Sequence, residues 1–560
     1  MSSSNPSSAQ PALHWRQGSS REGDTVRRNW IWWIALAAAV SFDYLFWDHK
    51  PGISFFVFIV VCLAAGIISA SVSGVAPNWK SVILIPCILA SAAITFLRVE
   101  PFTAFCGGVL SLALLMILAY SYRGGKWPFY GVIDHLIAAF GLSASAALHP
   151  ALLPAEKKPA DGSGGNRSIW RRWLPAVVRG LVLALPIVLL FAALLSAADP
   201  VFENAMQYVF DIQRLPEYLF RSAYIVIGMY LLVGVFLHAI LSSREERLPP
   251  PENPRVKPFI GFVESAVVLG CVSLLFAVFV VIQFRYLFGG QENITAEGFT
   301  YSEYARRGFG ELVAVAFFSL MLFLGFSSLT QREDPLRRRV FSGLGIFLVA
   351  MVVVILVSSY RRLLLYEDAY GFTGLRMYTH VFIIWLGILL VAVVGLEIAG
   401  RIGRFSMAAI AVAVGFTLTL AILNVDATIV RMNGLRTGKG FAPDTAVRRE
   451  GLRAEGGTAL DTDYFERLSA DAVPELLNLY AAGSQLEKDL IGAGLSCRLA
   501  RMEESRQDAW QSYLVPVAEA LRLLRASPVA SEYPVREERG VLYVSVGGND
   551  EVCQGQTWMD

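Results

Sequence analysis

Apolar runs long enough to cross a membrane recur along this chain and constrain its fold more than any other feature. The hydrocarbon core of a bilayer is about 30 Å thick, so a helix needs about 20 residues to cross it. Only 17% of the 560 residues are charged, whereas soluble domains average about 25%. The sequence therefore predicts an all-α polytopic membrane protein with about eleven transmembrane helices. The eleven runs are Trp30–Trp47, Ile53–Ser73, Trp79–Leu97, Phe102–Tyr122, Leu174–Ala198, Leu219–Leu241, Phe259–Phe288, Gly308–Leu329, Val340–Tyr360, Met377–Ala399 and Phe405–Leu423.

A twelfth run, Gly131–Leu148, is less apolar than the others. It contains Asp134 and His135 side by side, and much of the rest is Ala, Ser and Gly. Charged residues inside the hydrocarbon are costly. We therefore expect this run to lie in the membrane interface without crossing the bilayer.

Basic residues determine the expected orientation, because Lys and Arg are enriched in cytoplasmic loops. Five basic segments fall on one side of the membrane if eleven helices cross it and the twelfth run does not. They precede Trp30 or follow Leu148, Leu241, Leu329 and Ala399. We expect a multi-pass protein of the cell inner membrane, with a cytoplasmic N-terminus and a periplasmic C-terminal domain.

The chain divides into five parts by composition. Residues 1–28 form a Ser-rich, disordered cytoplasmic tail, and 29–148 form a membrane block of four spans and the interfacial helix. A basic cytoplasmic linker, 149–173, leads to a seven-span domain, 174–423. Residues 424–560 are polar and show helical periodicity, with one strand expected at "GVLYVSV". This part is expected to be a small, mainly helical extramembrane domain.

Cysteines give a further indication of the compartment. Four of the six lie inside apolar runs, while Cys497 and Cys553 lie in the C-terminal domain. An oxidising compartment would allow these two to pair, but their spacing does not show whether they meet. No cysteine–histidine spacing is typical of a metal site, so neither a metal nor another cofactor is expected.

The segment "TYSEYARRGFGE", from Thr300, combines charge of both signs at the start of a span. Thr300 and Glu303 match a capping box, in which two side chains satisfy free amides at a helix start. Arg306 and Arg307 lie in the first turns, where the helix dipole disfavours positive charge. Such arginines require acids or an anionic partner nearby.

Further charges are expected at the same outer face. One interpretation is a solvated ion-pair network with an aromatic belt. A second is an outward-facing site for an anionic or zwitterionic ligand, and a third is a docking surface for the C-terminal domain. The candidate ligand-binding residues are Arg285, Glu303, Arg306, Arg307, Glu311, Arg362, Glu367, Asp368 and Arg376.

Motifs for catalysis are missing from the sequence. There is no G-x-x-x-x-G-K-[ST] loop, no G-x-S-x-G elbow and no H-E-x-x-H pair. No catalytic residue is therefore proposed, and an enzyme is not expected. The net charge of +2 is too small to indicate a nucleic-acid partner.

Four segments carry a resemblance to a known family: "DYLFWDHKPGIS", "FRYLFGG…TYSEYARRGFGELVAVA", "RRLLLYEDAYGFTGLRMYTHVFIIWL" and "NVDATIVRMN…LDTDYFERLSADAVPELL". In this order they resemble a family of bacterial polytopic membrane proteins, the domain of unknown function numbered four one seven three. The resemblance extends from Asp43 to about Leu477. It implies a bacterial inner-membrane protein and no particular reaction.

The function predicted from these observations is a ligand-sensing or regulatory/assembly component with an outward-facing charged site. Its expected partners are the lipid bilayer and a signalling or envelope protein. The alternative is a secondary transporter or lipid-handling permease, which would require a polar path through the later spans. The sequence does not specify the ligand, the oligomeric state or the partner protein.

Overall fold

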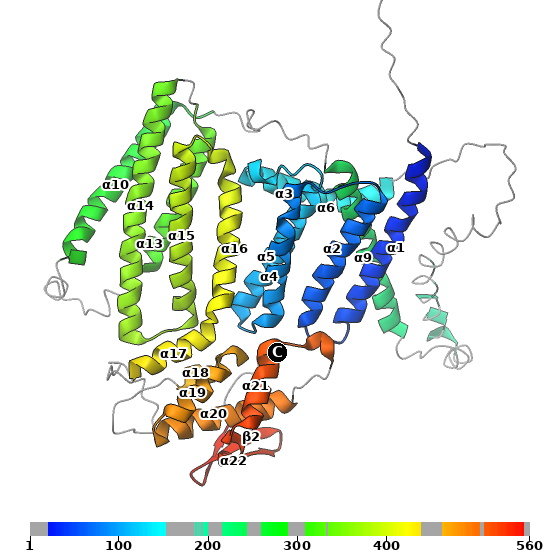
Figure 1. Cartoon of the computed structure of the whole chain (residues 1–560), viewed down its shortest axis with the longest axis vertical. Helices are drawn as coiled ribbons and strands as arrows, with labels where there is room; N and C mark the ends of the chain where they lie inside the picture. The colour runs from blue at the N-terminus through cyan, green and yellow to red at the C-terminus, as the bar shows by residue number, and fades with distance from the viewer. Residues whose placement is uncertain are drawn as a thin grey trace, which may run out of the picture.

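The computed structural model describes residues 21–152, 215–243, 259–288, 309–331, 334–437, 462–504 and 509–553, with isolated positions between 184 and 199. The chain is an all-α polytopic membrane protein with a small, mainly helical C-terminal domain (Figure 1). The elements of the membrane part are α1 (Arg21–Phe46), α2 (Ile53–Val72), α3 (Trp79–Val82), α4 (Leu84–Leu97), α5 (Pro101–Ser121), η1 (Trp127–Phe129), α6 (Val132–Leu152), α9 (Leu215–Leu237), η3 (His238–Ser242), α10 (Phe262–Phe288), α13 (Phe309–Leu329), α14 (Pro335–Tyr370), α15 (Gly374–Ile398), η4 (Ile402–Arg404) and α16 (Phe405–Leu423).

Among the described residues, ten helices are long and apolar enough to cross a membrane. Nine of them correspond to predicted spans, and the tenth, Val132–Ala151, corresponds to the run expected in the interface. The first predicted span matches the shorter apolar part of α1, Trp30–Phe46. The run Leu174–Ala198 lies almost entirely outside the described residues. That the helix Val132–Ala151 lies in the membrane interface without crossing the bilayer stays a prediction.

The membrane helices form two groups that α16 joins (Figure 1). One apolar core is shared by α1, α2, α4, α5, α6 and α9. Another is shared by α10, α13, α14 and α15. In the first of these cores, helix α9 packs against α1 and α6. It does so although α6 ends at Leu152 and α9 begins only at Leu215. Side chains of α16 contact the first core, and its C-terminal part contacts the core of the C-terminal domain.

Helix boundaries follow from local capping. Glu100 accepts hydrogen bonds from the amides of Phe102 and Thr103 at 2.8 Å each, and Pro101 occupies the first helical position of α5. These bonds satisfy amides that a helix start leaves free. At the end of α16, Asn424 adopts a left-handed conformation with φ 48°, which stops the helix and redirects the chain.

The C-terminal domain begins directly after this turn. Its core combines the helices with the ends of α15 and α16, and a three-stranded antiparallel sheet in the order β1-β2-β3 completes it. The predicted strand is β2, and the two strands beside it were not predicted. The elements are α17 (Val425–Thr437), α18 (Thr462–Glu466), η5 (Ala470–Ala472), α19 (Val473–Ala482), α20 (Gln485–Glu504), η6 (Trp510–Ser512), α21 (Val515–Ala526), α22 (Val529–Glu532), β1 (Val535–Glu538), β2 (Val541–Val546) and β3 (Asn549–Val552).

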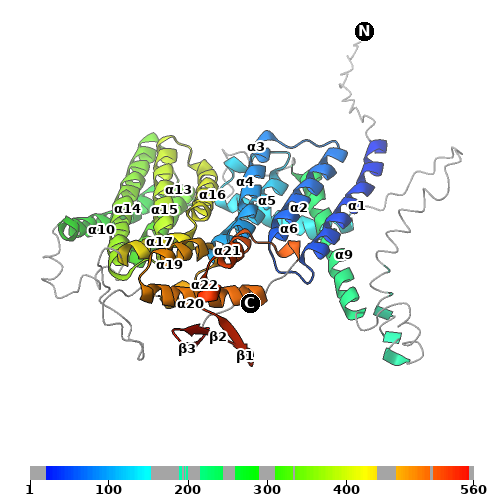
Figure 2. The ribbon, with the colours of Figure 1, turned by 60° about the horizontal axis from the view of Figure 1, so that its bottom comes forward.

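The domain covers one end of the membrane helices, which we call the domain end. It contacts the α1–α2 loop, the α4–α5 loop and the α14–α15 turn. The opposite end, the far end, contains the basic residues that follow α5, lie in the first turns of α14 and follow α15. Figure 2 shows α17, α19 and α21 lying across the domain end, with α20 and the sheet farther from the membrane helices.

Candidate functional site

The α14–α15 hairpin carries the predicted site residues that the structure describes at the domain end. Helix α14 has 36 residues and is therefore roughly 54 Å long, which exceeds the hydrocarbon thickness. Gly371 ends it with a φ of 79°, a conformation that glycine adopts without strain. A Cβ atom at Gly371 would lie 2.5 Å from the Arg436 Nη1 atom of α17, so a larger residue would have to displace this side chain as well as adopt a strained positive φ.

A carboxylate, an imidazole and a phenol form a chain across this hairpin. The Tyr360 hydroxyl and His380 Nε2 are 2.6 Å apart. On the other side of the ring, His380 Nδ1 lies 3.5 Å from Glu367 Oε2. Glu367 is 1% exposed, and neither of its carboxylate oxygens accepts a hydrogen bond among the described residues. A buried carboxylate whose only ionic partner among the described residues is an imidazole 3.5 Å away is costly, which marks Glu367 as a candidate binding residue.

Two arginines of the predicted site, Arg362 and Arg376, contact protein groups in the hairpin. The Arg376 guanidinium donates to the Gly371 carbonyl and lies 4.0 Å from the centre of the Tyr366 ring. Arg362 donates to the Gln283 side chain of α10 at 3.1 Å. These contacts secure the end of α14 to its neighbours.

The predicted site is therefore only partly assembled within the described residues. Arg362, Glu367 and Arg376 lie on the one hairpin, whereas Glu311 is exposed in the first turn of α13 and has no described contact with them. Arg285 and Asp368 lie in helices, but their side chains are outside the described residues. The predicted residues Glu303, Arg306 and Arg307, with the capped helix start expected near Tyr301, lie outside the described residues.

A second polar cluster joins the domain to the membrane helices, and we call it the joint. Its central residue is Asp471, whose side chain is 1% exposed. The carboxylate accepts hydrogen bonds from the amides of Val99 at 2.7 Å and Glu100 at 3.1 Å. It also pairs with Arg98 at 3.3 Å and accepts from the Ser469 hydroxyl at 3.2 Å. One acid of the domain thus holds the loop between α4 and α5.

Other buried groups extend the joint on both sides. The Tyr378 hydroxyl of α15 donates to Glu100, and the Asp426 carboxylate accepts from the Ser469 amide at 2.7 Å. Arg498 donates to the backbone carbonyls of Phe465, Glu466 and Ser469. The joint therefore connects α15, the α4–α5 loop, α17 and α20. The joint consists of Arg98, Glu100, Tyr378, Asp426, Ser469, Asp471 and Arg498.

Burial changes the acid–base properties of the joint. It raises the pKa of Asp426 to about 6, although hydrogen bonds from Ser469 act in the opposite direction. Burial also raises the pKa of Asp471, against the hydrogen bond from Val99 and the charge of Arg98. The pKa of Arg498 is lowered by burial to about 10, so this guanidinium remains charged at neutral pH.

Sequence reasoning did not identify the joint. Arg98 and Asp471 are separated by 373 positions, and no local pattern relates such distant residues. Two local signals existed: Glu100 immediately precedes Pro101, and Ser469 and Asp471 precede Pro474. Acids and Ser before a proline are typical of helix starts. These signals predict helix caps. They do not show that Asp471 also accepts hydrogen bonds from the distant amides of Val99 and Glu100.

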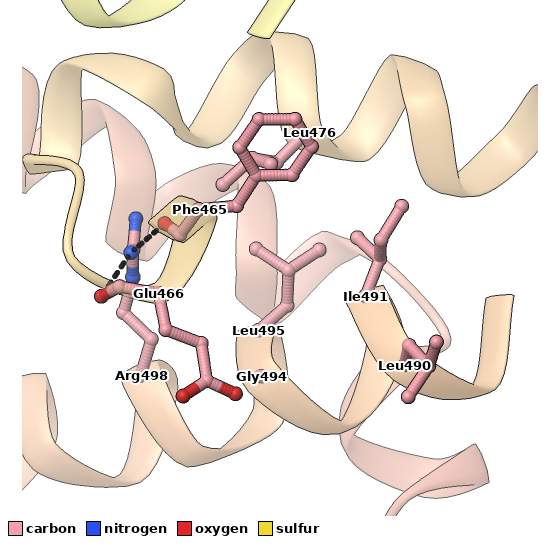
Figure 3. A pocket seen from close by; sticks show the side chains of 8 residues that line it. All are labelled: Phe465, Glu466, Leu476, Leu490, Ile491, Gly494, Leu495 and Arg498. Atoms are coloured by element: carbon pink, nitrogen blue, oxygen red, sulfur yellow. Dashed lines mark hydrogen bonds between the residues drawn. The ribbon is translucent and has the colours of Figure 1, made fainter. Parts of the chain in front are cut away.

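The domain also contains a small pocket between α18, α19 and α20 (Figure 3). Apolar side chains form most of its wall, and Arg498 closes one side with its guanidinium bonded to the carbonyls of Phe465 and Glu466. Its interior has room for about one water molecule. Among the described residues, no group of three or more His, Cys, Asp or Glu side chains is arranged to hold a metal ion.

A disulfide joins Cys497 of α20 to Cys553 at the end of β3, with the two Cα atoms 5.6 Å apart. The bond ties the sheet to the longest helix of the domain. Arg501 adds a hydrogen bond to the Cys553 carbonyl at 2.6 Å. The other four cysteines are free thiols in the membrane helices.

The fold and these clusters define the class: an integral membrane protein of many helices whose extramembrane domain is seated on one end of the helices. The chain belongs to the family described as Domain of unknown function (DUF4153), whose model matches residues 84–479. The family number expected from the motifs, four one seven three, is wrong, while membership of a domain-of-unknown-function family is confirmed. No curated protein and no solved structure matches the chain.

The matched range includes every residue of the joint except Arg498, and the whole α14–α15 hairpin. It ends inside α19. The disulfide and the sheet therefore lie beyond the family match. The part of the chain that the family model describes is the membrane helices from α4 to α16 together with the first elements of the domain, so α1, α2 and α3 precede the match.

Proposed function

We propose that this chain is a ligand-sensing or regulatory/assembly component of the bacterial inner membrane, with its charged α14–α15 hairpin facing outward. The observation that carries the proposal is Glu367, a fully buried carboxylate that accepts no hydrogen bond among the described residues. Such a group is stabilised by a ligand that supplies a donor or a positive charge. Arg362 and Arg376 of the same hairpin provide positive charge for an anionic part, so a zwitterionic ligand suits the hairpin best.

The hairpin is directly bonded to the domain, which supports a role in signalling. The Phe372 amide donates to Asn433 of α17 at 2.8 Å, and the Gly374 amide donates to the Tyr464 hydroxyl of α18 at 2.7 Å. Tyr378, one turn further along α15, reaches the joint through Glu100. A ligand that moves the start of α15 therefore changes contacts with two helices of the domain, α17 and α18, and with the α4–α5 loop.

The proposed orientation follows from charge and from the disulfide. The far end carries the basic segments that are typical of cytoplasmic loops, including Arg337, Arg338, Arg339, Arg401 and Arg404. A structural disulfide in the domain is typical of an oxidising compartment. We therefore propose that the far end and the N-terminus are cytoplasmic and that the domain is periplasmic, where a signalling or envelope protein is its partner.

The proposal is tested in a strain that lacks the native gene. Chains carrying Glu367→Gln, Arg376→Ala or Arg306→Ala are expressed in it, and the restoration of the wild-type growth and transcript profile is measured. Glu397→Gln is the matched control, because Glu397 is a buried acid of the neighbouring helix α15 that already accepts a hydrogen bond from Ser342 of α14 at 2.6 Å. We expect the control to restore the profile and the site variants to fail at equal protein levels. Full restoration by both Glu367→Gln and Arg376→Ala would disprove the site.

A secondary transporter or lipid-handling permease is the second candidate. A buried, unsatisfied acid in a polytopic membrane protein is also typical of a site for a coupling ion, and Glu367 is such an acid. This function predicts measurable uptake or lipid translocation in proteoliposomes, and Glu367→Gln would abolish it. The sensor predicts no translocation by either chain.

A further inference from the structure

One turn of the C-terminal domain exposes large aromatic side chains without a partner in the domain. Trp510 of η6 is 49% exposed, and Tyr513, which follows this turn, is 47% exposed. Between them, Gln511 is buried and Ser512 is bonded to the membrane part. Exposed aromatic pairs on a soluble surface are unusual and indicate an interaction site.

The turn is held firmly against the α1–α2 loop. The Ile53 amide donates to the Tyr513 carbonyl at 3.0 Å, and the Ser512 hydroxyl donates to the Lys50 carbonyl at 2.9 Å. A Cβ atom at Gly52 would lie only 2.6 Å from the Ser512 carbonyl carbon. The two backbones are therefore in direct contact, and the exposed rings have a defined height relative to α2.

That height corresponds to the edge of the hydrocarbon layer. Helix α2 starts at Ile53 and has 20 residues, and it contains no charged side chain. This length matches the thickness of the hydrocarbon core. Ile53 therefore lies at its boundary, and the turn bonded to Ile53 lies in the adjoining headgroup layer. Figure 1 draws this turn in orange below α2.

Membrane helices already carry aromatic rings at the same height. Tyr44 in the last turn of α1 lies 6.4 Å from Trp510 between ring centres. Trp47 lies 6.0 Å from Tyr224 and 6.1 Å from Phe220 of α9. Trp and Tyr concentrate at the membrane–water interface because their rings are apolar and their N–H or O–H groups are polar. Trp510 and Tyr513 continue this aromatic belt onto the domain.

We propose that Trp510 and Tyr513 insert into the headgroup layer of the bilayer, so that the C-terminal domain binds lipid directly. The joint then holds the domain to the α4–α5 loop, and the aromatic turn is a second attachment beside α1 and α2. This inference requires only that α2 spans the membrane. It is independent of any ligand at the α14–α15 hairpin.

The test places a fluorescent bimane at position 510. The four free cysteines are changed to alanine, the disulfide is kept, and Trp510→Cys is labelled and reconstituted into phosphatidylcholine vesicles. The control is Glu538→Cys on β1, an exposed position of the same domain. A nitroxide on the lipid headgroup is expected to quench position 510 at least threefold more than position 538. Aqueous iodide is expected to give the opposite order.

A second labelled position and two further outcomes complete the test. Tyr513→Cys is expected to behave like position 510, which guards against a local effect of losing Trp510. Equal headgroup quenching at 510, 513 and 538 would overturn the proposal. Protection of 510 and 513 from both the lipid nitroxide and iodide would also overturn it, because another protein surface would then cover the turn.

Discussion

Asp471 illustrates how one side chain can hold two parts of a chain together. Its buried carboxylate receives two backbone amides, a guanidinium and a hydroxyl. The amides of Val99 and Glu100 belong to the loop before α5 and have no helical partner. If the carboxylate is removed, these donors and Arg98 lose their acceptor, and breaking a buried charge pair is strongly destabilising.

We therefore expect Asp471→Ala to weaken the joint by roughly 3 kcal/mol. The value is at the lower end of the range because Arg98 is 26% exposed and is partly screened by solvent. Amide hydrogen exchange measures the effect, since the Val99 and Glu100 amides report local opening. They should exchange roughly 100-fold faster in the variant. The control is Glu475→Gln, a half-buried acid of α19 outside the joint, and unchanged protection in Asp471→Ala would show that other contacts hold the loop.

Asp426 predicts a pH dependence of the joint. Its pKa is about 6 in the folded chain, against an ordinary value of 3.8, so the folded state binds this proton more tightly. Its contribution to stability is therefore complete below pH 3.8 and is lost as the pH rises through 6. Between pH 8 and pH 5, acidification should stabilise the wild type relative to Asp426→Asn by about 1.4 kcal/mol. Urea unfolding of both chains at each pH measures the difference, and parallel curves would contradict the assignment.

Residues of the hairpin could be anticipated from the sequence, while those of the joint could not. Arg362, Glu367 and Arg376 lie within one short segment with an evident turn at Gly371, so local reasoning places them near each other. His380 and Tyr360 approach Glu367 because two helices pack side by side. The helical periodicity of a sequence shows which residues share one face of a helix. It does not show which other helix packs against that face. The joint depends on long-range packing, for which a single sequence contains no direct signal.

At the scale of elements, α6 has an unusual course. Its first turns lie at the end of α5, where the Tyr120 hydroxyl bonds to His135. Its last turns lie at the end of α9, where the His149 and His238 rings are 6.2 Å apart. These two places have the same height, because Arg123 after α5 donates to the Ile240 carbonyl of η3 at 2.7 Å. Because both ends of α6 lie at the same depth along the membrane helices, α6 runs across their far end and does not pass between the two ends.

This geometry predicts that α6 does not cross the bilayer, although its length and composition would permit crossing. Reporter fusions after Lys126 and after Leu152 test the prediction with alkaline phosphatase, which is active only outside the cytoplasm. Both fusions should be inactive, and a fusion at Lys50 in the α1–α2 loop should be active. Activity after Leu152 with inactivity after Lys126 would show that α6 spans the membrane.

Spans are predictable from sequence because hydropathy is a local property and the bilayer imposes a common length. The lateral arrangement of the spans, by contrast, is not predictable from the sequence. Lipid tails are as apolar as the helix surfaces, so the pattern of apolar residues does not distinguish a lipid-facing side from a helix-facing one. The packing of α9 against α1 illustrates this: Arg221 and Asp43 pair at 2.6 Å, but each residue alone is only a charge near the end of a span.

At the scale of the whole molecule, the disulfide supports the part of the domain that the joint does not reach. It closes a loop of 56 residues, and the chain-entropy relation gives about 4 kcal/mol for such a loop. Replacing Cys497 and Cys553 by serine should therefore lower the unfolding temperature of the domain by roughly 10–20 °C. Reduction of the wild type should give the same shift. The control is Cys271→Ser, an exposed free thiol of α10, which should leave the temperature unchanged.

The compartment that contains the disulfide also determines how the molecule is oriented in the membrane. The domain contacts the α1–α2, α4–α5 and α14–α15 connections, so its compartment is the compartment of all three. Intact spheroplasts are treated with a membrane-impermeant thiol reagent, in a chain whose four membrane cysteines are alanine. We expect Cys497 and Cys553 to be labelled only after reduction, which corresponds to a disulfide-bonded domain outside the cell membrane. Labelling that requires lysis would place the domain in the cytoplasm. The hairpin would then face inward, and the outward-facing ligand site would be excluded together with the periplasmic partner.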